Sequence, residues 1–235
     1  MSEIATVLFD VGGTLMHDDP PVPEVFATVA NRLGYHVDSA DAWRCMIDCN
    51  RFCEQAYLTD GDFWCVHDRA VQLWLDMYTM MAVGCGIDHG LAELAQAVYD
   101  EYLKPENWTI YPDVTDCLKA LKHAGLQVGI VSNWDASLVN LIRRIGLLPY
   151  IDEVIASAAV GCRKPNPAIF EIALERMGAE ASRTVHVGDL PEADGEGASS
   201  AGIKPVIIDR KGTLDDCPFA VIATLHELPG LIGIS

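Results

Sequence analysis

The chain has 235 residues, 50% of them hydrophobic, and carries 34 acidic against 16 basic side chains, a formal net charge of −18. This length and composition allow one large buried core, or a core that carries an inserted module. The negative charge excludes nucleic acid and anionic membranes as expected partners, because their phosphates would be repelled, so an anionic substrate needs a local positive group.

The start of the chain and its cysteines indicate a compartment. A predicted strand begins almost at once after Met1, without the basic and apolar leader of a secreted protein. No apolar run approaches the ~20 residues of a membrane span. The eight cysteines are therefore expected to be reduced thiols, and the protein is expected to be cytoplasmic.

The predicted first strand, residues 4–10, is an apolar run that ends in Asp10 and is followed by Gly12 and Gly13. Glycines allow a tight turn, so the pattern places a carboxylate on a turn at the carboxyl end of a buried strand. In open α/β sheets ligands bind at that edge. Asp10 is the first candidate site residue.

From about Pro20 to Lys104 the apolar residues repeat with a helical period and indicate an all-helical insertion. Four amphipathic helices are predicted, near residues 22–34, 39–58, 62–82 and 88–104. Proline clusters at both ends of this stretch, before residue 24 and after residue 104, support its boundaries.

Cys45, Cys49 and Cys53 recur every four residues within this insertion and would share one helix face. The outer two would lie ~12 Å apart along the axis, whereas thiolates that share a zinc ion each lie ~2.3 Å from it. This geometry argues against three ligands from one helix. Two of the cysteines could join Cys65 and another donor around a metal ion, but we expect packing residues, since free cysteine is often a small buried apolar residue.

From Tyr111 the pattern alternates between helix and strand, which implies a parallel sheet with right-handed crossovers. The predicted class is α/β, a Rossmann-like, doubly wound parallel sheet with an inserted all-helical cap. We assign residues 1–16 and 107–235 to the core and residues 17–106 to the cap. The predicted elements are helix 113–124, strand 127–132, helix 136–146, strand 153–156, helix 167–177, strand 184–189, helix 195–201, strand 205–209, a further short strand and a terminal helix.

Three segments of the core end in polar residues suited to an anion or a metal. The strand over residues 128–131 leads into Ser132 and Asn133, a loop rigidified by prolines carries Lys164, and the strand from Thr184 leads into Asp189, with Asp194 five residues later. Neighbouring carboxylates repel one another unless a cation lies between them, and oxygen ligands suit Mg²⁺.

The order Asp10-x-Gly12-x-Thr14, Ser132, Lys164 and Gly188-Asp189 with Asp194 resembles the four motifs of the haloacid dehalogenase superfamily. The resemblance covers essentially the whole chain and is nearest to the subgroup with a helical cap after the first motif. It implies that Asp10 is the nucleophile, that Ser132, Asn133, Gly13 and Lys164 bind the substrate, and that Lys164 also acts in catalysis.

The resemblance also implies a Mg²⁺ site formed by Asp10, the backbone carbonyl of Gly12 and Asp189, with Asp194 in support. The family's phosphatases carry a second Asp, the general acid and base, where this chain has Gly12. Because a carbonyl does not depend on the side chain, the metal site should survive. Only a proton donor is lost, worth roughly 10²- to 10⁴-fold in rate.

Three functions follow from this pattern. We expect a Mg²⁺-dependent phosphatase acting on a small phosphorylated molecule, in which an acidic leaving group, a water, or His17, Asp18 or Asp19 makes up for the missing acid. The alternatives are a metal-independent, dehalogenase-like hydrolase, whose relatives also lack the second Asp, and a catalytically silent binding or regulatory protein.

Overall fold

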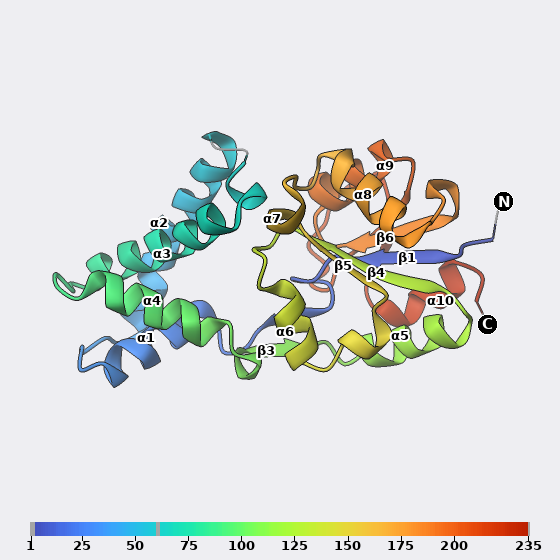
Figure 1. The fold of residues 1–235 in the computed structure, drawn as a ribbon. Coiled ribbons are helices and arrows are strands. Elements are labelled where there is room, and N and C mark those ends of the chain that lie inside the picture. The colour runs from blue at the N-terminus through green and yellow to red at the C-terminus, as the bar shows by residue number, and fades with distance from the viewer. Residues whose placement is uncertain (1–2, 60–61, 235) are drawn as a thin grey trace. The chain divides into compact units, whose positions relative to one another are not determined.

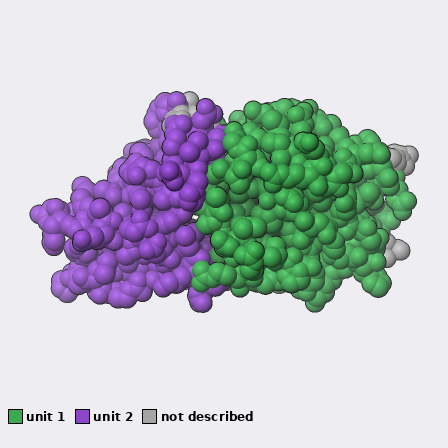
Figure 2. All heavy atoms as spheres, viewed as in Figure 1, with its two compact units in different colours: residues 1–17, 110–235 green, residues 18–109 purple. Residues whose placement is uncertain are grey.

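The computed structural model describes residues 3–59 and 62–234, and Figure 1 shows its fold. The chain forms two compact units, which Figure 2 colours separately. One consists of residues 1–17 and 110–235, and the other of residues 18–109.

The first unit is built on a six-stranded parallel sheet in the order β5-β4-β1-β6-β7-β8. The first strand therefore lies inside the sheet, where Phe9 pairs with Ile130 on one side and Val187 on the other. The α/β class and the doubly wound sheet predicted from the sequence are confirmed. The strands are β1 (Thr6–Phe9), β4 (Gln127–Ser132), β5 (Glu153–Ala156), β6 (Thr184–Gly188), β7 (Lys204–Ile208) and β8 (Ala220–Ile222).

Helices cover both faces of this sheet, which explains why β1 and β6 are apolar runs rather than alternating ones. In Figure 1, α8 and α9 lie on one side of the sheet and α5 and α10 on the other. On the α8 side, Phe170 and Ile169 pack with Leu8 and Val131 in one buried cluster. The helices are α5 (Val114–His123), α6 (Leu138–Arg144), α7 (Ser157–Val160), α8 (Pro167–Met177), α9 (Gly197–Ser200) and α10 (Leu228–Leu231).

Helix α8 begins and ends as its sequence predicts. The Asn166 side chain accepts a hydrogen bond from the Ala168 amide, and Pro167 occupies the first turn, where its missing N–H costs nothing. Gly178 ends the helix in the left-handed conformation. The predicted helix 195–201 differs, because a π-helical turn over Pro191–Glu196 precedes the short α9.

The second unit is helical, with a core in which Phe26, Tyr78, Met81 and Leu94 are fully buried. Its third helix begins at His67 rather than near residue 62, because Phe63–Cys65 form a separate 3₁₀ turn, η1. The helices are α1 (Val22–Arg32), α2 (Ser39–Thr59), α3 (His67–Gly84) and α4 (Leu91–Tyr102), followed by the 3₁₀ turn η2 (Pro105–Asn107).

The two chain segments that connect the units pair as strands β2 (Met16–Asp18) and β3 (Trp108–Ile110). The sequence analysis did not predict this pair, because three residues are too few to establish a period. Among the described residues, none of the helices has the length and apolar character needed to cross a membrane.

The three regularly spaced cysteines of α2 contact different atoms. Cys49 donates to the Met77 carbonyl, Cys53 lies 3.8 Å from the Met77 sulfur, and the Cys45 sulfur lies 3.8 Å from that of Cys85. Each cysteine therefore packs separately against α3 or the residue after it, as the spacing along the helix requires.

A buried ion pair joins the turn after β1 to the far edge of the sheet. Arg210, which follows β7, makes two hydrogen bonds to the Asp113 carboxylate, at 3.0 and 3.1 Å, and two more to the carbonyl of Thr14. The amide of Leu225 donates to the same carboxylate, and the Arg210 guanidinium lies 3.7 Å from the centre of the Tyr111 ring. These contacts hold the pKa of Asp113 below its ordinary value, against the effect of its burial.

Removing one partner of this pair should leave a buried charge unpaired. We expect Arg210→Met to lower the free energy of unfolding by about 3–5 kcal/mol, measured by urea denaturation at pH 7. The matched control is Arg176→Met, which breaks the more exposed pair with Glu153 and should cost less than about 1 kcal/mol. Equal losses in the two variants would contradict this account.

Candidate active site

Three of the predicted site residues lie at the carboxyl ends of neighbouring strands. Asp10 follows β1, Ser132 ends β4, and Asp189 follows β6. Because β1 pairs in register with both other strands, these ends meet at one edge of the sheet. The polar residues that end these apolar strands therefore lie together in one site.

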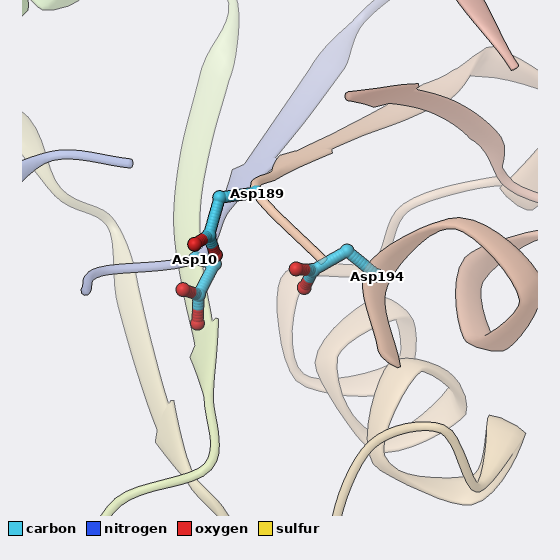
Figure 3. A group of neighbouring side chains, drawn as sticks. All are labelled: Asp10, Asp189 and Asp194. Atoms are coloured by element: carbon cyan, nitrogen blue, oxygen red, sulfur yellow. The ribbon is translucent and has the colours of Figure 1, made fainter. Parts of the chain in front are cut away.

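Asp194 joins this edge from the π-helical turn after β6. One oxygen from each of Asp10, Asp189 and Asp194 lies within 4.8 Å of the others. Figure 3 shows the three carboxylates gathered around a common space. Asp10 and Asp194 are buried, and Asp189 is half-buried, so little water screens their mutual repulsion.

Lys164 provides the positive charge at this edge. Its ammonium nitrogen lies 2.6 Å from Asp10 Oδ1 and 2.5 Å from Asp194 Oδ1, and the side chain is only 3% exposed. The predicted cation and nucleophile are thus in direct contact. The structure adds a contact to Asp194, for which the sequence analysis proposed only support of a metal.

The three carboxylates respond differently to this ammonium. Burial raises the pKa of Asp10, although the charge of Lys164 and hydrogen bonds from Lys164 and Ser132 oppose it. Burial also raises the pKa of Asp189, to about 7, and the charges of Asp10 and Asp194 add to the effect. For Asp194 the Lys164 charge and a hydrogen bond from His186 outweigh burial and hold the pKa well below its ordinary range.

Three donors explain why Asp194 stays ionised. Oδ1 accepts from Lys164 and from His186 Nε2, at 2.9 Å, and Oδ2 accepts from the Leu190 amide at 3.0 Å. His186 is fully buried in β6, and its ring packs edge-on against Phe170. Its other nitrogen, Nδ1, is buried without a partner, so the arrangement with the hydrogen on Nε2 costs least.

Both polar atoms of the Asn133 side chain form hydrogen bonds with the backbone of Lys164. Its Nδ2 donates to the Lys164 carbonyl at 3.0 Å, and its Oδ1 accepts from the Lys164 amide at 2.8 Å. These bonds fix the loop that carries the lysine. The contact with substrate that the resemblance implies for Asn133 stays a prediction.

The glycines of the first motif are not equivalent. A Cβ on Gly13 would lie 2.4 Å from Asp189 Oδ2, and its positive φ of 69° also favours glycine. The Gly13 amide donates to the Met16 carbonyl. A Cβ on Gly12, by contrast, would meet no atom within 4 Å, so the backbone there does not require a glycine.

Other residues considered from the sequence lie as follows. His17 is on β2, with its ring 4.8 Å from that of Tyr111. Arg163 donates to the carbonyl of Lys164 through a 3.4 Å contact. His186 was not among the predicted site residues. The feature of the sequence that could have indicated it is a single histidine in an otherwise apolar strand, shortly before Gly188 and Asp189.

The hydrogen bond from His186 should be visible in acid stability. A carboxylate with a lowered pKa stabilises the fold above its unfolded pKa of ~3.9, and this stability is lost as pH falls through the folded pKa. We expect His186→Leu to raise the pKa of Asp194, and so to lower the free energy of unfolding most at neutral pH and less as pH falls below ~3.9, whereas His186→Gln, which keeps a donor, recovers part of this loss.

The matched control is Thr184→Val, two residues earlier on the same strand, which removes a buried hydrogen bond to the Glu180 carbonyl. Thr184→Val should lower the free energy of unfolding by an amount that does not change with pH. Urea denaturation from pH 3 to 8 measures all three variants, and parallel profiles for His186→Leu and Thr184→Val would contradict the assigned contact.

Comparisons with known proteins agree with this geometry. The haloacid dehalogenase-like hydrolase family model matches residues 4–202. The haloacid dehalogenase-like hydrolase domain-containing protein 3 of Danio rerio is 32% identical over 234 residues, which cover 95% of this chain and 94% of that protein. A ribulose-1,5-bisphosphate 5-phosphatase of Halopiger xanaduensis is 33% identical over 49% of this chain and 48% of its own length.

Solved structures give the same result over nearly the whole chain. A haloacid dehalogenase-type phosphatase from Thermococcus onnurineus is 28% identical with a TM-score of 0.69, and covers 98% of both chains. A 2-haloacid dehalogenase from Pseudomonas syringae is 26% identical with a TM-score of 0.68, again over 98% of both. With its strand-end Asp10, its Lys164 contact and these matches, the chain belongs to the haloacid dehalogenase-like hydrolase family.

Proposed function

We propose that this hydrolase is a Mg²⁺-dependent phosphatase that releases phosphate from a small phosphorylated metabolite through an intermediate on Asp10. The observation that carries the proposal is the placement of the Lys164 ammonium against Asp10, with Asp189 and Asp194 beside it. A nucleophilic carboxylate and a fixed cation at the carboxyl edge of a parallel sheet suit an anionic substrate.

The residues at this edge fit a divalent cation. Three carboxylates lie together, and the ammonium of Lys164 contacts two of them, Asp10 and Asp194. Burial raises the pKa of Asp189 to about 7, and the charges of Asp10 and Asp194 raise it further. Asp10, Asp189 and the Gly12 carbonyl would hold the ion, and Asp194, already bonded to three donors, would support them. When bound, Mg²⁺ would neutralise charge on the carboxylates and on the substrate phosphate.

Asp10, Lys164 and Ser132 would each have a separate role in the reaction. An Asp10 oxygen attacks phosphorus and forms a new P–O bond while the bond to the leaving oxygen breaks. That oxygen departs as an anion or takes a proton from water. Lys164 and the Ser132 hydroxyl stabilise the charge on the transferred group. Water then attacks the phosphoaspartate, which regenerates the Asp10 carboxylate and releases inorganic phosphate.

The names of relatives point to both activities, because the Pseudomonas syringae structure is named a 2-haloacid dehalogenase. The Halopiger relative is named a phosphatase, and so is the Thermococcus structure. A haloacid substrate would bring a further carboxylate to three that are already crowded, and without a metal it would be repelled. No disulfide joins the eight cysteines, all of which lie in the described part of the chain, and this suits the cytoplasmic location that we propose for this reaction.

Phosphate release with and without chelator tests the proposal. We expect the wild-type protein to hydrolyse members of a panel of phosphate esters and acyl phosphates with Mg²⁺, and to lose this activity with EDTA. Asp10→Asn should lose at least about 10³-fold, because the nucleophile is gone. Halide release from haloacids that persists in EDTA would instead favour the dehalogenase, and no turnover on either panel would favour a silent binding protein.

Restoring the missing acid should change the reaction in a defined direction. Because a Cβ at position 12 meets open space, Gly12→Asp should fold normally. We expect it to raise kcat on alkyl phosphates at least about tenfold, and to change kcat on acyl phosphates little, because their leaving group departs without a proton.

The control for this substitution is Gly12→Asn, which has nearly the same shape but cannot donate a carboxyl proton. Steady-state rates of the three proteins on the same substrates make the comparison. An equal gain from Asn and Asp, or no gain from Asp on any alkyl phosphate, would contradict the assigned loss of a general acid.

A further inference from the structure

A cavity of about 470 Å³ lies within the helical unit, between α2, η1 and α3. This volume is in the range of sites for small molecules. Its aromatic walls come from Tyr57 on α2, from Phe63 and Trp64 on η1, and from Trp74 on α3. All of its described lining residues belong to the helical unit, whereas the carboxylate cluster belongs to the other unit.

The aromatic walls hold one another in place. The ring centres of Phe63 and Trp64 are 5.1 Å apart, and those of Trp64 and Trp74 are 5.8 Å apart in an edge-on arrangement. Trp74 also stacks with the buried Tyr78, with 6.3 Å between the ring centres. Trp64 and Trp74 nevertheless stay partly exposed, unlike core residues, so their surface is available to a ligand.

The charge around the cavity selects among ligands. Of the described residues that line it, only Glu54 is charged, and it is exposed. Residues 18–109 hold 16 acidic and 5 basic side chains, a net charge of −11. An anion is therefore repelled, whereas a cation with an apolar surface gains from both the carboxylate and the aromatic rings.

We propose that this cavity binds an organic ammonium group of a small effector molecule. The ring electrons attract the cation, its methyl or methylene groups contact the aromatic walls, and Glu54 balances its charge. The proposal does not rest on the phosphatase function, because binding is measured without turnover.

Choline and its neutral isostere 3,3-dimethylbutan-1-ol provide the test. Titration of the full chain, followed by calorimetry and by tryptophan fluorescence, should give choline a Kd at least about tenfold lower than that of the neutral alcohol. Glu54→Gln should weaken choline binding severalfold and leave the alcohol unchanged. The matched control, Glu24→Gln on α1, removes an exposed acid outside the cavity and should change neither.

Trp74→Leu should abolish binding of both compounds, provided that its circular dichroism spectrum matches that of the wild type. If it does not fold, Glu54→Gln alone decides the question. Equal affinity for the two compounds, or no binding of choline, overturns the proposal.

Discussion

The ammonium group of Lys164 is what allows buried carboxylates to occupy the same edge of the sheet. Two of them, Asp10 and Asp194, contact this nitrogen within 2.6 Å, and both are nearly inaccessible to water. Without the ammonium, their repulsion in a medium of low polarity would raise the pKa of both carboxylates and oppose the ionisation of Asp10. Asn133 fixes the backbone of Lys164, and His186 fixes Asp194, so the cation is held from both sides.

The sequence predicted the parts of this site that follow from local pattern. Asp10, Ser132 and Asp189 could be placed at one edge because each ends an apolar strand, and parallel strands bring such ends together. Their residue roles came from the family resemblance. The roles of Asn133 and His186 could not be predicted, because their partners lie 31 and 8 residues away in the chain and the contacts depend on how a loop and a π-helical turn fold back.

The same limit applies to the glycines and cysteines. In the sequence, Gly12 and Gly13 look alike, yet only the second is required by a nearby side chain, Asp189. The spacing of Cys45, Cys49 and Cys53 was enough to argue against a metal site with three ligands from one helix, because distances along a helix are fixed by its geometry. Strands β2 and β3 were missed because pairing between two three-residue segments depends on contacts far apart in the chain.

The contacts of Arg210 show that residues beyond the segment matched by the family model support the turn after β1. The family match stops at residue 202, after the last of the four motifs, but the guanidinium that binds the Thr14 carbonyl lies eight residues beyond it. Leu225, which shares the Asp113 carboxylate with Arg210, lies further still. The turn that carries Asp10 is therefore held by a residue beyond the segment that the family model matches, and the contacts of the ion pair that holds it reach past the last strand of the sheet.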